Sequence, residues 1–355
     1  MQRYLAILFF LLYFNVRFAV LMPFTSGTRQ DDNNMDFYSG VLMAAKKYGD
    51  AGLDININAL DLKRWQTVLP SAADSNGFIL GPMKCEDISY VIDRIDTLTP
   101  VISPLDAKAI ELAGTRPNVV EAATQQQDQY REALEWAKEE TAAQRNVNYI
   151  VITCEQDTAL LRTVRTLMDG YGLRYSICTC GVQKEITNWE NCRIPVEAGV
   201  NVAILAINNE AVLNNAVRNM SIYAKEGNTL VFTGSKVRSY ETIPVECLHK
   251  ARVHALCPYF VDYRAPETRA FIHNYRDIYH TEPSQYAFQG YDLGCYMILG
   301  YAVYGKGWMD AMESEPVTDG IQTSFKMKRI ENGGLKNTAV RRVLYDVDYT
   351  VKLIK

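Results

Sequence analysis

Short apolar runs and longer segments of helical periodicity alternate along most of the chain. Near the start, an apolar run over 17–24 is followed by a polar loop, a helix-like segment over 35–48 and a second apolar run over 53–60. A strand, a loop, a helix and a strand form a βαβ unit, whose two strands run parallel. In such folds the loops at the carboxyl ends of the strands hold small molecules.

The same alternation recurs in two successive series, so the sequence predicts an α/β domain present twice. Further strands are predicted at 77–82, 99–104, 118–120, 148–153, 173–178, 200–206, 229–233 and 252–257. Further helices are predicted at 88–95, 125–145, 158–171, 210–225, 266–279 and 286–304. The last quarter changes character: 320–328 and 343–351 alternate apolar and polar residues, which predicts antiparallel or edge strands around a turn at 331–335.

Composition narrows the class of function. The 355 residues are 48% hydrophobic and 22% charged, as in an ordinary globular protein of two domains or one large α/β body. A net charge of −4 argues against a nucleic-acid partner, because phosphate binding needs a concentrated basic surface. The chain has no G-x-S-x-G, P-loop, H-E-x-x-H or G-x-G-x-x-G motif, so no enzymatic activity and no cofactor is expected.

The N-terminal segment has several possible interpretations. An apolar run over 4–14 follows Arg3, as in an export signal. It is shorter than the ~20 residues of a membrane span, and no small-x-small cleavage site follows it. An export signal is favoured; an uncleaved anchor and a misplaced start codon are the alternatives.

Eight cysteines and four histidines give little indication of a metal site. Zinc sites favour C-x-x-C spacing, whereas the closest pair here is Cys178 and Cys180. In an exported protein, Cys178, Cys180 and Cys192 lie near enough in sequence for one local disulfide. His249 and His254 stand five residues apart at a loop–strand junction, and no metal site is expected there.

Several segments together resemble the type I periplasmic substrate-binding proteins of the leucine/isoleucine/valine-binding type, most closely divergent members from the Bacteroidetes. The segments that carry the resemblance are 18–24, 37–45 (FYSGVLMAA), 77–82 (GFILGP), 100–104 (PVISP), 271–283 and 287–294 (AFQGYDLG). The resemblance implies two doubly wound, Rossmann-like α/β lobes joined by a three-crossover hinge. Lobe 1 would comprise 17–122 and 254–332, and lobe 2 would comprise 123–253 and 333–355, after a possible signal or anchor segment at 1–16.

The resemblance also implies a ligand in the cleft between the lobes, lined by loops at the carboxyl ends of strands. The candidate ligand-binding residues are Thr25, Met83, Ser103, Asp106, Glu155, Asn208, Asn209, Ser235, Gln289 and Tyr291. By position Ser103 is the candidate hydroxyl for a ligand carboxylate, with the backbone of Met83 nearby. The tract at 82–85 (PMKC) departs from the serine- or alanine-rich tract of the family, which weakens the case for amino-acid specificity.

Each candidate also has an ordinary structural interpretation. Ser103, Asn208, Asn209 and Ser235 could be turn residues or helix caps. Glu155 and Asp157 could cap the helix predicted from residue 158, since anions favour a helix N-terminus, or meet a cationic ligand. Asp106 and Lys84 could pair across adjacent loops or be solvated surface charges.

The sequence therefore predicts a non-catalytic protein of the periplasm or cell envelope that closes on a small polar ligand, such as an amino acid or a peptide. A membrane permease would be its partner in uptake or sensing. The alternative is an envelope module that regulates peptidoglycan synthesis by contact with a cell-wall enzyme.

Overall fold

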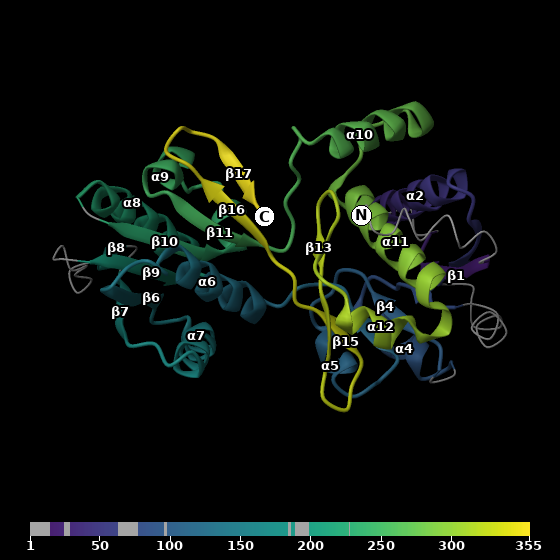
Figure 1. Cartoon of the computed structure of the whole chain (residues 1–355), viewed down its shortest axis with the longest axis horizontal. Helices are drawn as coiled ribbons and strands as arrows, with labels where there is room; N and C mark the ends of the chain where they lie inside the picture. The colour runs from purple at the N-terminus through teal and green to yellow at the C-terminus, as the bar shows by residue number, and fades with distance from the viewer. Residues whose placement is uncertain are drawn as a thin grey trace. The chain divides into compact units, whose positions relative to one another are not determined.

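The chain forms two compact α/β units. The computed structural model describes residues 15–24, 29–62, 77–95, 98–183, 186–188, 199–226 and 228–355. Unit 1 takes the chain up to Gln125 together with Val261–Ala339, and unit 2 comprises Gln126–Phe260 and Val340–Lys355 (Figure 1). The chain passes from one unit to the other three times, as the predicted fold class requires.

Unit 1 is built on a seven-stranded sheet in the order β14-β15-β5-β4-β3-β1-β2. Its strands are β1 (Asn15–Met22), β2 (Asp54–Asp61), β3 (Ile79–Leu80), β4 (Val101–Ser103), β5 (Val119–Glu121), β14 (Met327–Arg329) and β15 (Leu335–Asn337). All neighbours pair in parallel except β14, which forms an antiparallel hairpin with β15. The first five strands therefore have the doubly wound order 2-1-3-4-5.

Helices cover both faces of this sheet. One face carries α2 (Arg29–Asp50), α11 (Gln285–Tyr304) and α12 (Trp308–Ser314), and the other carries α4 (Cys85–Ile92) and α5 (Ala109–Ala113). Helix α10 (Pro266–Tyr279) packs outside α11 through Phe271 and Tyr275. A short hairpin of β12 (Thr318–Asp319) and β13 (Ser324–Phe325) follows α12.

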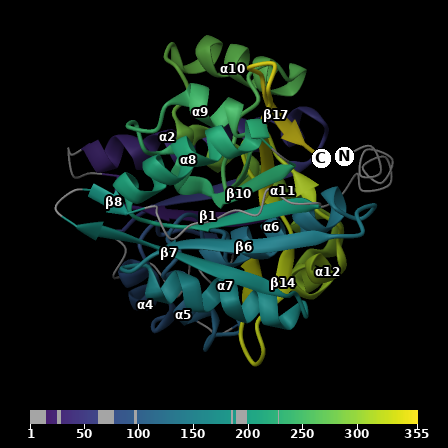
Figure 2. The same cartoon turned by 90° about the vertical axis from the view of Figure 1, so that its left-hand side faces the viewer.

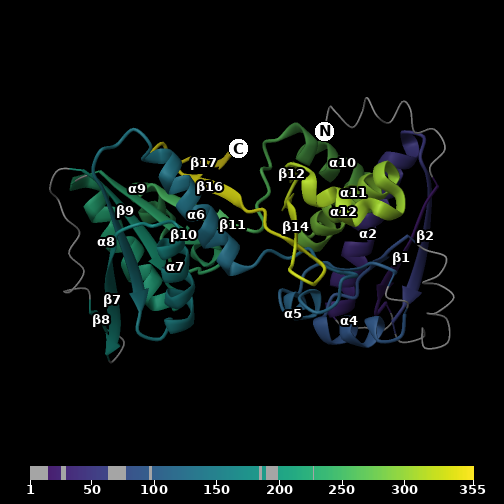
Figure 3. The same cartoon turned by 60° about the horizontal axis from the view of Figure 1, so that its bottom comes forward.

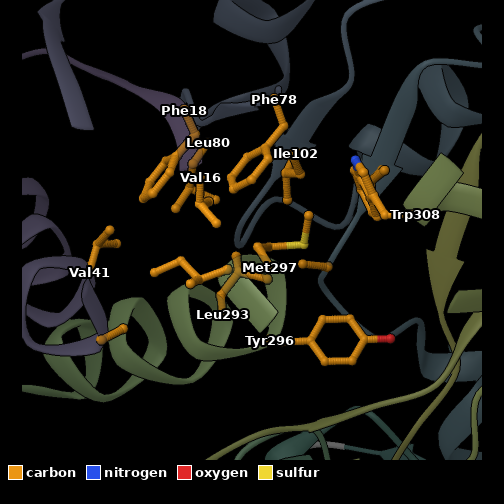
Figure 4. Packing of buried hydrophobic residues seen from close by; sticks show 14 of the residues in the cluster. Val16, Phe18, Val41, Phe78, Leu80, Ile102, Leu293, Tyr296, Met297 and Trp308 are labelled. Carbon is orange, nitrogen blue, oxygen red and sulfur yellow. The ribbon is translucent and has the colours of Figure 1, made fainter. Parts of the chain in front are cut away.

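Aromatic side chains dominate the larger core of unit 1 (Figure 4). The ring of Phe18 from β1 stacks on that of Phe78 with centroids 4.7 Å apart, and Trp308 meets Phe78 edge-on at 6.2 Å. Leu293 and Met297 of α11 fill the space beneath them. Such aromatic pairs contribute about 1 kcal/mol beyond their area burial, so this cluster fixes α11 against the sheet.

Unit 2 repeats the same plan with an eight-stranded sheet in the order β17-β16-β11-β10-β9-β6-β7-β8. Its strands are β6 (Val147–Cys154), β7 (Tyr175–Gln183), β8 (Ile186–Asn188), β9 (Val200–Ala206), β10 (Thr229–Gly234), β11 (Val253–Cys257), β16 (Arg341–Tyr345) and β17 (Val351–Ile354). Strands β7, β6, β9, β10 and β11 are parallel and again follow the order 2-1-3-4-5. The repeat predicted from the sequence is thus confirmed.

The helices of unit 2 also lie on both faces of its sheet (Figure 2). Helices α8 (Glu210–Glu226) and α9 (Val245–Lys250) pack on one face, and α6 (Gln126–Glu140) and α7 (Thr158–Gly170) pack on the other. A 3-10 turn, η2 (Ser235–Arg238), follows β10. In the part of the chain that the structure describes, every helix is too short or too polar to cross a bilayer.

Three predictions about the last third of the chain need correction. The segment 254–260 belongs to unit 2, because β11 continues the parallel sheet beside β10. The segment 333–339 belongs to unit 1, because β15 pairs with β5. The two alternating segments do not pair with each other: β14 pairs with β15 in unit 1, whereas β16 pairs with β17 in unit 2.

His254 is a fully buried titratable group in the core of unit 2. Its ring stacks on Phe232 with centroids 4.4 Å apart and meets the ring of Trp136 edge-on with centroids 4.6 Å apart. Nδ1 contacts the carbonyl oxygen of Val231 at 3.2 Å, and Nε2 has no hydrogen-bond partner among the described residues. Burial first, and the positive charge of Arg252, lower the pKa of His254 to about 4. A charged imidazole is therefore much less stable here than in the unfolded chain.

We expect unit 2 to lose stability as the pH falls. Between pH 6.5 and 4 the unfolded chain protonates His254 while the native protein does not, so unfolding becomes easier through that window and stays unaffected above it. From pH 7 to pH 5 the loss is about 2 kcal/mol. Urea unfolding at both pH values measures this loss. We expect the full loss in the wild type and a clearly smaller loss in His254→Phe. The exposed control His273→Asn should lose as much stability between the two pH values as the wild type does.

Candidate functional site

The structure gives each unit an equivalent place for a site. In a doubly wound sheet, ligands bind beyond the carboxyl ends of the strands where the strand order reverses. This point lies between β1 and β3 in unit 1 and between β6 and β9 in unit 2. The loops that leave these strands carry Met83, Glu155, Asn208 and Asn209, and Ser103, Asp106 and Ser235 lie at the ends of neighbouring strands.

In unit 1, Asp106 joins the loop after β4 to the loop after β3. Its Oδ2 accepts a hydrogen bond from the backbone N–H of Cys85 at 2.8 Å, and its Oδ1 accepts one from the N–H of Lys108 at 3.0 Å. Cys85 is the first residue of α4, so Asp106 caps that helix from the neighbouring loop. Lys84 is exposed and extended at the N-cap position.

Ser103 ends β4 and is fully buried. Its backbone oxygen accepts from the N–H of Ala122 at 2.9 Å, but its hydroxyl oxygen has no hydrogen-bond partner among the described residues. A buried hydroxyl without a partner costs about 1–3 kcal/mol of stability. Such a group is rare in native proteins, and this unpaired hydroxyl keeps Ser103 a candidate for contact with a ligand.

Gln289 and Tyr291 lie on different sides of α11. Gln289 is buried, donates to the carbonyl oxygen of Pro104 at 3.3 Å and accepts from Thr323 Oγ1 at 2.6 Å, so it lies beside the loop of Ser103. Tyr291 packs instead on Phe271, with ring centroids 4.5 Å apart, and its pKa is raised by burial. The structure therefore brings Gln289 to the predicted edge and turns Tyr291 toward α10 and α2.

Met83 is half-buried in the loop after β3 and packs against the larger core of unit 1. Thr25 lies outside the described residues.

In unit 2, Asn208 is the centre of a polar network. Its backbone N–H donates to Asp157 Oδ2 at 2.8 Å, its side-chain oxygen accepts from Gln126 Nε2 at 2.8 Å, and its carbonyl oxygen accepts from the Tyr240 hydroxyl. The network joins the loops after β6 and β9 to the start of α6 and to the segment after η2. Asp157 thus bonds to the loop before α8, and its side chain does not cap its own helix, α7.

Three other candidates lie at the same edge of unit 2. Asn209 Oδ1 accepts from the N–H of Val212 at 3.1 Å and caps α8, while its amide donates to Gln156 at 3.3 Å. The N–H of Ser235 donates to Gln129 Oε1 at 2.9 Å. Glu155 is exposed, with its carboxylate beside Gly181.

Sequence reasoning did not find Gln126, Gln129 and Tyr240. All three reach the edge from elements that follow no strand of the switch point: the first two from the first turn of α6 and the third from the loop after η2. The glutamines at 125–127 and 129 form a run of amides, and this was the signal available in the sequence.

The cysteines near this site fall into two kinds. Cys178 is disulfide-bonded. Cys180 is a buried thiol two residues beyond it on β7, in register with Cys154 of β6, and burial raises its pKa to about 11. The predicted disulfide partner Cys192 lies outside the described residues.

Comparison with known proteins supports the fold rather than a specific activity. No protein-family model and no curated protein matches the sequence. Among solved structures, a candidate branched-chain amino acid ABC transporter protein from Rhodospirillum rubrum is similar over 96% of this chain and 100% of that chain, with a TM-score of 0.68 and 14% identity.

Two further solved structures are similar over 96% of this chain. A branched-chain amino acid ABC transporter periplasmic ligand-binding protein from Burkholderia xenovorans is covered over 94%, with a TM-score of 0.59 and 10% identity. An ABC transporter substrate-binding protein from Desulfitobacterium hafniense, in complex with Leu, is covered over 100%, with a TM-score of 0.52 and 13% identity. At these identities the likeness is one of fold.

Proposed function

Because the chain has the type I periplasmic-binding-protein fold, we propose that it binds a small polar ligand between its two units and catalyses no reaction. The observation that carries this proposal is the repeated polar edge. Each unit has the strand order 2-1-3-4-5, and each places polar side chains at the carboxyl edge of its sheet beside the switch point. Two half-sites of this kind suit a ligand that both units contact.

Binding would work by a population shift. Three chain passages join the units, so a change in a few backbone torsions suffices for closure. A ligand that contacts both units favours the closed form by its differential affinity for that form. The protein would serve uptake or sensing, with a membrane permease as the partner for uptake.

The disulfide of Cys178 supports a location in the periplasm or cell envelope. Disulfides persist in oxidising compartments and are rare in the cytosol, where thiols are kept reduced.

A thermal-shift screen tests the proposal. Amino acids, short peptides, sugars, nucleobases and small amines are added to the full chain, and we expect at least one class to raise the unfolding temperature by several degrees, because a ligand that binds only the native state stabilises it. A screen in which every class leaves the unfolding temperature unchanged would contradict the proposal.

Ser103→Ala and Asn208→Ala then test the placement of the site, with one change in each unit. We expect each to weaken binding of the ligand found by about tenfold or more, since each removes a polar contact. Ser103→Ala is the cleaner variant, because its hydroxyl has no hydrogen-bond partner in the described part of the chain and its loss should not destabilise the protein. Asn219→Ala on α8, whose amide bonds within its own helix, is the control and should bind as the wild type does. Unchanged affinity in both site variants would show that the site lies elsewhere.

A further inference from the structure

Carboxylates of the chain itself occupy the helix starts at the candidate site. In unit 1, Asp106 Oδ2 accepts from the first N–H of α4 at 2.8 Å. In unit 2, Asp157 Oδ2 accepts at 2.8 Å from the N–H of Asn208, the second residue before α8, and Asn209 Oδ1 accepts from the N–H of Val212 in its first turn. In unit 1 a carboxylate caps the helix itself, whereas in unit 2 the amide of Asn209 caps α8 and the carboxylate of Asp157 bonds to the backbone just before that helix.

These positions are where an external carboxylate would otherwise be favoured. A helix N-terminus presents backbone N–H groups and a partial positive charge, and it binds anions readily. An aspartate already bonded there satisfies a donor and neutralises that charge. A second carboxylate at the same place would meet a like charge, which disfavours the ionised form of both.

Neighbouring acidic side chains add negative charge at the start of α4 in unit 1, and Lys84 and Lys108 offset part of it. The first turn of α4 carries Glu86 and Asp87, and Glu111 lies on α5. Burial, and then the negative charges of Asp106 and Glu111, raise the pKa of the Cys85 thiol, and the positive charge of Lys108 lowers it. The half-exposed carboxylate of Asp106 keeps acceptor capacity for a cationic donor, because an ionised carboxylate has about four lone-pair sites.

Ser103 supplies the second feature of the same edge. Its fully buried hydroxyl has no hydrogen-bond partner within the described ranges, and it lies three residues before Asp106. A primary ammonium has three N–H donors and no acceptor, so it can donate to a serine oxygen and to a carboxylate together.

We infer that the ligand of the proposed site is a small organic amine that carries no carboxylate. This inference rests on the proposed function. It distinguishes the chain from a receptor for free amino acids, in which the ligand's own carboxylate needs a free anion site.

Matched pairs of compounds that differ by one carboxylate test the inference. Lysine is compared with cadaverine, arginine with agmatine, and leucine with isopentylamine, by calorimetric titration of the full chain. We expect a pair in which the decarboxylated compound binds at least about tenfold more tightly than its amino acid. An amino acid that binds more tightly than its amine would overturn the inference and leave the proposed function standing.

A second measurement needs no cognate ligand, so it distinguishes a failure of this inference from a failure of the proposed function. Asp106→Ala frees the start of α4, so sodium acetate should raise the unfolding temperature of this variant by several degrees over sodium chloride at equal ionic strength, but leave the wild type unchanged. Asp277→Ala, which removes an exposed carboxylate from α10, is the control and should behave as the wild type. An equal response to acetate in wild type and Asp106→Ala, or no response in either, would show that Asp106 does not block a carboxylate site.

Discussion

Replacing Gly40 with alanine should destabilise unit 1 by about 3 kcal/mol or more. Helices α2 and α11 lie side by side (Figure 3), and a Cβ at Gly40 would lie 2.0 Å from the carbonyl oxygen of Ala287 and 2.7 Å from the N–H nitrogen of Tyr291. Both obstacles are backbone atoms of α11, so no side-chain rotation relieves the clash. The helices would have to separate and open the core beneath them.

The same helix provides the control for this prediction. Gly49 is exposed on α2, and a Cβ there meets no atom within 4 Å. Gly49→Ala should leave the stability unchanged or raise it by up to about 1 kcal/mol, because alanine loses less conformational entropy in a helix. Urea unfolding followed by circular dichroism measures both variants, and equal stabilities for the two would contradict the described packing.

Removing the side chain of Asp292 should have an effect of similar size. This carboxylate is 2% exposed and accepts hydrogen bonds from three successive backbone N–H groups, those of Ile321, Gln322 and Thr323, at 2.8, 2.7 and 2.8 Å. Asp292→Ala would leave buried donors without an acceptor, at a cost of about 4 kcal/mol. Gly320 packs against the same carboxylate, since a Cβ there would lie 2.4 Å from the Asp292 carboxyl carbon.

Two further variants locate the origin of the Asp292 effect. Asp292→Asn keeps one acceptor oxygen and should be intermediate in the free energy of unfolding. Asp277→Ala removes a carboxylate that is 64% exposed and pairs with His273, and it should cost less than about 0.5 kcal/mol. If Asp292→Ala were as mild as Asp277→Ala, the three N–H groups would have other acceptors.

The strands and helices of the parallel sheets could be predicted because their signals are local. The apolar run at 200–206 corresponds to β9, buried at every residue, and the periodic segment at 158–171 corresponds to α7. The pairing of the late strands could not be predicted. The alternation at 320–328 and 343–351 indicates strands but not their place in the sheets. The hairpin of β14 and β15 joins its sheet at β5, and β16 joins its sheet at β11, both far away in sequence.

The candidate site shows the same division between local and distant signals. The loops at the strand ends follow from the order of elements, so the positions of Ser103, Asp106 and Asn208 at these strand ends could be predicted. The hydrogen-bond partners of these residues could not be predicted. The sequence allows Asp157 either to cap its own helix or to meet a cationic ligand, whereas its carboxylate bonds to Asn208, 51 residues away in sequence. A hydrogen bond to a backbone N–H so far away in sequence produces no recognisable pattern in a single sequence.

Small-angle X-ray scattering with and without a ligand that calorimetry shows to be bound is the most direct measurement of closure. We expect the radius of gyration to decrease at saturating ligand, and to stay at its ligand-free value in Ser103→Ala at a concentration too low to saturate that variant. A saturated protein whose radius of gyration does not change would contradict closure of the two units around the ligand.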